Sequence, residues 1–302
     1  MLTIFTIPKP FVGHIGIIQR NAVHSWSCLR PRCEIILCAD EPGTEEAAAE
    51  FGAKHIADVA RNEYGTPLLD SVFEQVEEAA SHDLICYVNA DIILLSDFAR
   101  AVHRLAGSKR LFLMVGRRRD VDISERLDFG PGWEERLRAY IAWMGRLYPR
   151  EGIDYFVFRR GSMGKLPPFA VGRPAWDNWF IYRARKLGIP VVDATRVVTA
   201  AHQNHGYDHV PKRRDDTWGG PEGDRNRELA GAPDCIFTLL DATHVMTSRR
   251  LLPALGYLHL RRRLRTLPIL VPSAAPLERF MRTARARARA LLRGWVSHGV
   301  NA

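Results

Sequence analysis

Cysteines are few in this sequence, and they follow neither a metal-binding nor a disulfide pattern. Five of them, an odd number, are scattered between Cys28 and Cys235 without the paired spacing of a zinc site. The sequence therefore gives no disulfide framework, and a reducing cytosol is the compartment expected for the chain.

Long apolar runs and glycine-rich phosphate loops are also missing. No apolar stretch reaches the ~18 residues of a membrane-spanning helix, because Arg or Lys interrupts each candidate. Met1–Pro10 has an apolar run without a basic region or a cleavage site, so we expect a first strand there and no signal peptide. The glycine patterns of P-loop and dinucleotide-binding proteins do not occur, which counts against ATPases and dehydrogenases.

Positive charge is concentrated toward the C-terminus. The net charge is +9, but Val245–Ala302 holds 12 Arg and the single acidic residue Glu278, so that segment carries +11 and the preceding residues −2. Prolines accumulate at the same place. We therefore predict a compact domain over residues 1–245 and a basic, helical or partly disordered tail over residues 246–302.

The order of apolar segments predicts an α/β fold. Strand-like runs at Leu2–Ile7, Glu34–Ala39 and Leu84–Val88 alternate with helix-like segments at Ile15–Leu29 and Pro67–Ala80. This alternation predicts a Rossmann-like, mostly parallel sheet with helices on both faces, where ligands bind beyond the carboxyl ends of the strands. Later in the chain we expect strands at 111–115, 153–158, 191–193 and 196–199, and helices at 133–147 and 176–186.

Asn89 and Asp91 directly follow the apolar strand Leu84–Val88. Two oxygen-bearing side chains spaced i, i+2 at a strand end can face one hard cation that bridges to a diphosphate. A polar strand end that caps the next helix is the alternative, and the position in the sheet favours the functional interpretation.

The segment Gly172–Phe180 is a second candidate, because a glycine turn precedes a helix start with one carboxylate, Asp177. A carboxylate can remove the proton of an incoming hydroxyl, although Asp at a helix start also stabilises the helix dipole. Trp176 and Trp179 could stack on a sugar ring, but two tryptophans at this spacing on a helix are more often core residues. Arg173 could bind a phosphate or an acceptor anion, or lie solvated on the surface.

Three histidines, His202, His205 and His209, lie within eight residues just after the strand expected at 196–199. Such a density is hard to explain by core packing, and neutral imidazole is a common metal ligand. A self-contained zinc site is one interpretation, but it would lack a cysteine, and Gly206 disfavours a continuous helix. A site for Mg²⁺ or Mn²⁺ is preferred.

In order and spacing, the three motifs resemble the nucleotide-sugar glycosyltransferases of the GT-A fold, family 2-like, over roughly residues 1–210. The resemblance implies that Asp91 is the second Asp of a metal-binding Asp-x-Asp motif and that Asn89 replaces the first. It further implies that His202 or His205 completes the coordination of Mn²⁺ or Mg²⁺, and that Asp177 is the catalytic base of an inverting transfer. Because Asn89 brings no charge, metal affinity should depend more heavily on Asp91.

Donor contacts are expected at the ends of the first strands. In this architecture Thr6, Pro8 and Asp40 lie where the base and ribose would dock, and Arg61 could reach the diphosphate. Asn89 can accept a hydrogen bond from ribose or from a metal-bound water. Arg173, Trp176 and Trp179 are then the expected acceptor contacts.

The tail mixes arginine with Leu, Ile, Phe280 and Trp295, which suits an anionic membrane surface. Peripheral attachment at the cytoplasmic face of the inner membrane would bring the enzyme to a lipid-linked or growing polysaccharide acceptor. A merely solvated tail is an alternative, and nucleic acid binding would be non-specific, because no recognition module is present.

These features predict a cytoplasmic glycosyltransferase, hexosyltransferase-like, that moves a sugar from a nucleotide diphosphate sugar to a glycan or lipid-linked acceptor. A sugar nucleotidyltransferase is disfavoured, because no Gly/Arg/Lys-rich triphosphate loop occurs near residues 8–20. A non-catalytic carbohydrate-binding or scaffold protein is the remaining alternative, in which Asn89 would mark the decay of the metal motif.

Overall fold

A computed structural model describes residues 1–205, 219–231 and 235–274 of the chain. The chain divides into two units, Met1–Ala254 and Leu255–Ala302. The first unit extends nine residues beyond the boundary predicted at residue 245, because Val245 lies within the strand His244–Met246, which pairs on both sides in the sheet of this unit. His209 and the tail from residue 275 onward lie outside the described residues.

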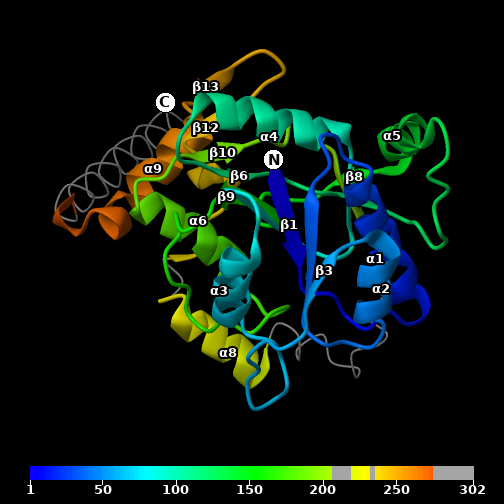
Figure 1. The fold of residues 1–302 in the computed structure, drawn as a ribbon. Helices are drawn as coiled ribbons and strands as arrows, with labels where there is room; N and C mark the ends of the chain where they lie inside the picture. Colours follow the sequence, from blue (N-terminus) through cyan, green and yellow to red (C-terminus); the bar gives the residue numbers. More distant parts are fainter. Residues whose placement is uncertain (206–218, 232–234, 275–302) are drawn as a thin grey trace, which may run out of the picture. The chain divides into compact units, whose positions relative to one another are not determined.

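A nine-stranded mixed sheet forms the centre of the first unit (Figure 1). Its pairs are parallel, except that β9 runs antiparallel to β4 and β6, and β13 runs antiparallel to β12. In order across the sheet, the strands are β13 (Leu251–Pro253), β12 (His244–Met246), β10 (Val191–Asp193), β6 (Leu113–Val115), β9 (Tyr155–Arg159), β4 (Leu84–Val88), β1 (Leu2–Thr6), β2 (Glu34–Cys38) and β3 (Lys54–Ile56). The predicted mostly parallel α/β sheet is confirmed.

Helices cover both faces of this sheet, as the strand and helix alternation predicts. Leu2 and Ile4 of β1 belong to a core cluster that includes buried side chains of α1 (Gly13–Ser27), α2 (Thr44–Phe51) and α4 (Ser96–Ser108). The opposite face is aromatic: Phe5 of β1 packs edge-on against Phe73 of α3 (Leu69–Ala79), with ring centroids 5.0 Å apart. Phe180 of α6 (Trp176–Lys186) joins the same aromatic cluster.

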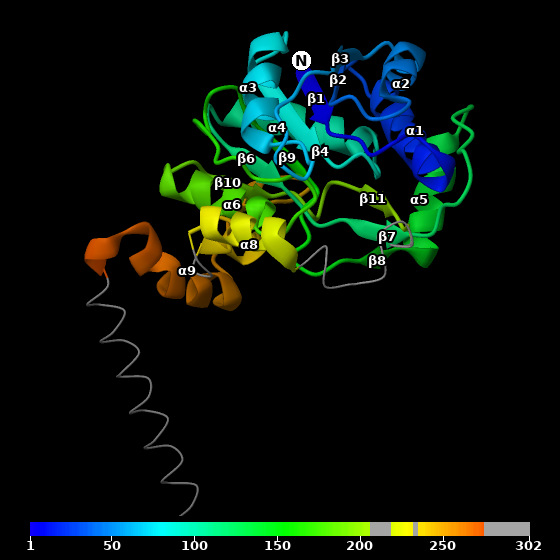
Figure 2. The ribbon, with the colours of Figure 1, turned by 90° about the horizontal axis from the view of Figure 1, so that it is seen from below.

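A smaller sheet adjoins the carboxyl end of β4 and holds the candidate site (Figure 2). Its strands in spatial order are β5 (Ile92–Leu94), β11 (Ala200–Gln203), β7 (Arg119–Val121) and β8 (Arg146–Leu147). One face packs on α5 (Trp133–Met144), where Leu137 and Ile141 meet Ile93 and Val121. The first unit also contains α8 (Gly220–Leu229) and the short 3-10 helix η2 (Leu239–Asp241).

The strand predicted at 196–199 is displaced along the chain, and β11 begins at Ala200. The backbone N–H groups of Val197 and Val198 both donate to the carbonyl of Ala194, so this segment is a turn. Only from Ala200 onward can the chain pair with β5 on one side and β7 on the other. His202 therefore lies within a strand and not after one.

In the second unit, the described residues form α9 (Tyr257–Leu270) and a short 3-10 helix, η3 (Pro272–Ala274). No helix among the described residues is long and apolar enough to cross a membrane. The large apolar side chains Tyr257 and Leu258 of α9 are 75% and 47% exposed.

Candidate metal centre and active site

Strand pairing brings Asp91 and the histidine segment together, although more than a hundred residues separate them. Asp91 lies in the turn between β4 and β5, and β11 pairs antiparallel with β5 so that His202 is opposite Ile92. The backbone N–H of Gln203 donates to the carbonyl of Asp91 at 3.2 Å. The histidines thus meet the carboxyl end of β4, where ligands of parallel sheets bind.

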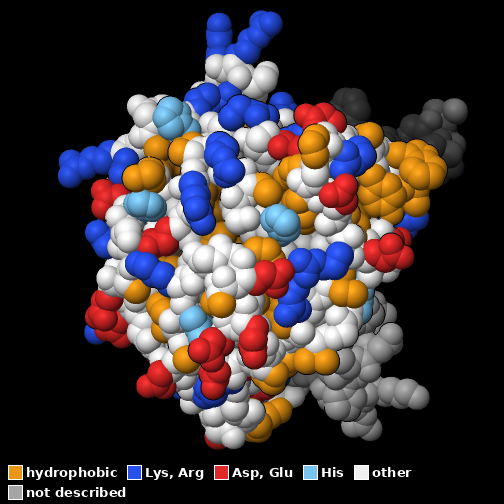
Figure 3. All heavy atoms as spheres, turned by 45° about the vertical axis from the view of Figure 1, so that its right-hand side comes forward, with side chains coloured by type: hydrophobic (Ala, Val, Ile, Leu, Met, Phe, Trp, Pro, Cys, Tyr) orange, Lys and Arg blue, Asp and Glu red, His pale blue; other side chains and the backbone are white. Residues whose placement is uncertain are grey.

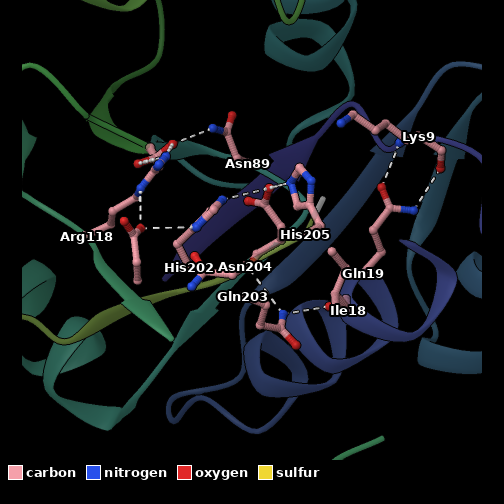
Figure 4. A network of polar contacts seen from close by, with 12 residues as sticks. Lys9, Ile18, Gln19, Asn89, Arg118, His202, Gln203, Asn204 and His205 are labelled. Carbon is pink, nitrogen blue, oxygen red and sulfur yellow. Dashed lines mark hydrogen bonds and ion pairs between the residues drawn. The ribbon is translucent and has the colours of Figure 1, made fainter. Parts of the chain in front are cut away.

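Asp91, His202 and His205 form a compact group of three ligand atoms, all within 4.8 Å of one another, among the described residues. The Nε2 atom of His205 lies 3.1 Å from Oδ2 of Asp91, and Nε2 of His202 lies 3.5 Å from the same oxygen. Figure 4 shows the rings of His202 and His205 turned toward one another's side of the site, and both rings contact the same oxygen of Asp91. The predicted partners of Asp91 therefore converge on it.

The chemistry of this group fits a divalent cation. The other oxygen of Asp91, Oδ1, is buried and makes no hydrogen bond to any described residue. Leaving a buried carboxylate oxygen unsatisfied is costly, and coordination of a cation is one way to satisfy it. The side chains of Asp91, His202 and His205 are 19%, 12% and 8% exposed, so a bound ion would be largely enclosed by protein.

Charge is strongly coupled within the group. Burial raises the pKa of Asp91, but the charges and hydrogen bonds of His202 and His205 outweigh it and hold this pKa well below its usual range. Burial lowers the pKa of His202, while the carboxylates of Asp91 and Asp120 raise it to about 10. In the metal-free protein, a protonated His202 therefore supplies the positive charge that Asp91 needs.

A second carboxylate, Asp120, contacts His202 from the opposite side. Its Oδ1 lies 3.2 Å from Nδ1 of His202 and also accepts from Nε of Arg118 at 2.8 Å. Arg118 in turn donates to both oxygens of Asp154, at 3.0 and 3.2 Å. Asp154 accepts from the amide nitrogen of Asn89 at 2.7 Å, so a continuous polar chain runs from Asn89 to His202 (Figure 4).

The buried side-chain amides of Gln203 and Gln19 hold backbone segments beside the site. The side chain of Gln203, fully buried, donates to the carbonyls of Ile18 and Asp91 at 2.8 and 3.1 Å. Gln19 accepts from the backbone N–H of Lys9 at 2.7 Å and donates to its carbonyl at 2.8 Å, which ties the segment after β1 to α1 (Figure 4). Gln203 thereby links the backbone of Asp91 to that of Ile18 in α1.

Asp177 lies in the first turn of α6, as predicted. Burial, together with the charge of Asp154, raises its pKa to about 7. The preceding Trp176 packs edge-on against Tyr87 of β4, with ring centroids 5.0 Å apart, which places Asp177 near the carboxyl end of β4. Ala175, just before the helix, has a φ of 84°, a strained value for a non-glycine residue that is characteristic of functional sites.

Two of the expected acceptor contacts are accounted for by packing. Trp176 and Trp179 are only 6% and 7% exposed, and Trp179 stacks edge-on against Phe169. Arg173 donates to Glu222 of α8 through Nε at 2.9 Å, and Glu222 also accepts from Asn62. Each of these residues thus has a structural role. Acceptor binding by them stays a prediction.

The expected donor contacts occupy mixed environments at the ends of β1 and β2. Thr6 and Pro8 are buried, whereas Asp40 is exposed. Arg61 forms an ion pair with Glu41 at 3.0 Å and donates to the carbonyl of Gly65 at 2.8 Å. Their roles toward a donor likewise stay predictions.

Arg118, Asp120 and Asp154 belong to the site but were missed by reasoning from the sequence. The acidic alternation of Asp120 and Asp122 just beyond Leu113–Val115 is the one local feature that could have pointed to β7. Asp154 precedes an ordinary strand and reaches Asn89 only because β9 runs antiparallel to β4.

The sequence matches no protein-family model and no curated protein. Among solved structures, the chain is similar to glucosyl-3-phosphoglycerate synthase from Mycobacterium tuberculosis in complex with Mn²⁺, uridine-diphosphate-glucose and phosphoglyceric acid, at 15% identity and a TM-score of 0.45, over 77% of this chain and 80% of that one. It is also similar to residues 1–349 of S. aureus TarS in complex with UDP-GlcNAc, at 12% identity and a TM-score of 0.44, over 76% and 70% of the two chains.

Proposed function

We propose that this protein is a metal-dependent glycosyltransferase that uses a nucleotide diphosphate sugar as donor and a glycan or lipid-linked molecule as acceptor. The observation that carries the proposal is the convergence of Asp91, His202 and His205 at the carboxyl end of β4, with one buried carboxylate oxygen left without a described partner. Asp177 adds a carboxyl group with a pKa near neutrality at the same end of the sheet.

In the proposed reaction, the bond from the anomeric carbon of the donor to its diphosphate oxygen breaks, and a bond to the acceptor oxygen forms. Asp177, as its carboxylate, takes the proton of the acceptor hydroxyl, and the diphosphate leaves with the electron pair. Attack opposite the leaving group inverts the anomeric carbon. Asp91, His202 and His205 would hold a cation, which when bound would supply positive charge to the leaving diphosphate.

The three proposed metal ligands favour Mn²⁺ over Mg²⁺. Mg²⁺ prefers an all-oxygen shell, whereas two imidazole nitrogens and one carboxylate oxygen also suit borderline transition metals. Zn²⁺ accepts the same set, so it is the competing ion to include in every binding experiment.

The decisive experiment measures nucleotide release from UDP-, GDP-, CMP- and TDP-linked sugars, with and without Mn²⁺, together with thermal stabilisation by each donor. We expect one nucleotide to stabilise the protein in a metal-dependent way and to be turned over when an acceptor is present. Asp91→Asn should abolish both effects, because it removes the charged ligand.

Asp83→Asn is the matched control, since Asp83 is 76% exposed and lies just before β4 at the end opposite Asp91. Metal-dependent donor binding without turnover would favour the carbohydrate-binding alternative. Release of pyrophosphate from a sugar phosphate and a nucleoside triphosphate would instead identify a nucleotidyltransferase.

We further propose that the basic C-terminal region attaches the protein to the cytoplasmic face of an anionic membrane and so brings it to polysaccharide biosynthesis. In α9, Arg261 and Arg265 accompany the exposed Tyr257 and Leu258, the combination of basic and apolar side chains that binds such surfaces. By contrast, acidic and basic side chains are interspersed on the face of the molecule drawn in Figure 3. Sedimentation with phosphatidylglycerol vesicles should weaken in Arg261→Gln/Arg265→Gln, and equal sedimentation would contradict attachment through α9.

A further inference from the structure

Asp120 contacts the proposed metal ligand His202. The function proposed above gives Asp120 itself no role. Parallel pairing of β7 with β11 sets Asp120 directly beside His202 in register. Neighbouring residues in register project from the same face of a sheet, so the two side chains meet without any loop adjustment. The contact is therefore built into the strands and does not depend on a mobile segment.

The two nitrogens of His202 face different carboxylates. Nδ1 lies 3.2 Å from Oδ1 of Asp120, and Nε2 lies 3.5 Å from Oδ2 of Asp91. A histidine can bind a metal only through a nitrogen that carries no proton, and its other nitrogen then keeps the proton. Nδ1 is buried and makes no hydrogen bond to the described residues, so its contact with Asp120 is an electrostatic one. A carboxylate at this distance favours the tautomer with the proton on Nδ1, which leaves the Nε2 lone pair facing Asp91.

Asp120 is itself fixed in place. The oxygen that contacts His202 also accepts from Nε of Arg118 at 2.8 Å, and the guanidinium lies over the ring of Tyr148, 4.1 Å from its centroid. Arg118 is held in addition by Asp154. Because its partners determine the position of Asp120 Oδ1, they also determine the orientation of the His202 ring.

We propose that Asp120 is a positioning residue of the metal centre, which selects the His202 tautomer with a free Nε2 and aims that nitrogen at the cation beside Asp91. The inference rests on the proposed metal-dependent function, and it concerns ligand orientation and not substrate. Removing such an outer carboxylate typically weakens metal binding about 10- to 100-fold.

The experiment measures Mn²⁺ affinity of the full chain, without donor or acceptor, from the EPR signal of free Mn²⁺. A second measurement records the visible absorption of bound Co²⁺, which reports ligand geometry. Asp120→Ala should weaken Mn²⁺ binding about 10- to 100-fold and alter the Co²⁺ spectrum. Asp120→Asn keeps an acceptor oxygen for Arg118 and His202 but loses the charge, so we expect a smaller loss, about tenfold.

Asp83→Asn controls for the loss of a carboxylate elsewhere and should bind both ions like the wild type. If both Asp120 variants bind Mn²⁺ within about twofold of the wild type and keep its Co²⁺ spectrum, the proposal is wrong. Should Asp120→Ala fail to fold, Asp120→Asn alone decides by the same criteria. Tight Mn²⁺ binding that depends on Asp120, without any donor turnover, would overturn the proposed function and leave this inference standing.

Discussion

The free energy of unfolding of the metal-free protein should fall as pH rises, whereas the affinity of the protein for metal should rise. The reason is His202, whose side chain is 12% exposed and whose pKa rises from 6.5 to about 10 beside Asp91 and Asp120. A pKa raised by folding adds stability that is fully present below the unfolded value and is lost as pH rises through the folded value. The interval of loss therefore runs from about pH 6.5 to about pH 10.

The magnitude follows from the size of the shift. Each pH unit over which the folded protein keeps a proton that the unfolded chain has lost lowers the stability by about 1.4 kcal/mol. Between pH 7 and 8.5 the metal-free protein should therefore lose about 2 kcal/mol. Carboxylates contribute little to this change, since Asp177, with a pKa raised to about 7, is largely ionised above that pH.

Metal binding should show the reverse trend. Because a coordinating imidazole must release its proton, affinity for Mn²⁺ should rise with pH over the same interval. Stabilisation by a fixed Mn²⁺ concentration, which grows as the logarithm of the affinity, should then be larger at pH 8.5 than at pH 7.

The assay is urea unfolding at pH 7, 7.5, 8 and 8.5, in EDTA and in MnCl₂. His202→Gln is the matched variant, because it keeps the size of a polar side chain and cannot titrate. Its metal-free stability should vary much less with pH than that of the wild type. A wild-type protein whose metal-free stability is as flat as that of His202→Gln would refute the assignment of a charged His202 paired with Asp91.

The other predictions concern the proposed base and two buried polar contacts. Asp177→Asn should lower kcat by about 10²- to 10⁴-fold while donor-induced stabilisation persists, and wild-type activity should rise with pH through about 7, as the carboxylate forms; a rate that is insensitive to both changes would exclude this base. Arg173→Gln should lower the free energy of unfolding by about 1 to 2 kcal/mol by removing a partner of Glu222, and it should raise the acceptor KM through loss of the predicted acceptor contact; an unchanged acceptor KM would contradict that contact. Asn226→Ala, at a residue 1% exposed, should cost about 1 to 3 kcal/mol in urea unfolding, because it leaves the backbone N–H and carbonyl of Ala170 without their side-chain partners; a loss below about 0.5 kcal/mol would mean that water replaces these partners.

The local sequence pattern was sufficient to predict the strands and helices whose apolar residues are buried. The run Leu84–Val88 predicts a buried strand wherever it pairs, and the observed β4 has those bounds. The helix expected from Trp176 to Lys186 is likewise α6 with the same bounds. Such segments are recognisable because their apolar spacing reflects a single burial environment over several residues.

The same patterns did not resolve which polar or aromatic side chains would be available to a ligand. The spacing of Trp176 and Trp179 is compatible with either a sugar platform or a core, and only the packing of α6 on the aromatic face of the sheet shows that both side chains are largely buried. Arg173 meets Glu222 because α8 returns to that loop from about fifty residues away. Neither outcome is encoded in the spacing of the residues themselves.

For the site, the sequence by itself determined the carboxylate Asp91 at a strand end and a nearby supply of imidazole, since parallel strands present their carboxyl ends at one edge. Only the tertiary structure decided that His202 lies inside β11, that β7 brings Asp120 to its Nδ1, and that Arg118 connects this pair to Asp154. The physical reason is that strand partners and their register arise from contacts between segments remote in the chain, and those contacts depend on the packing of the whole sheet.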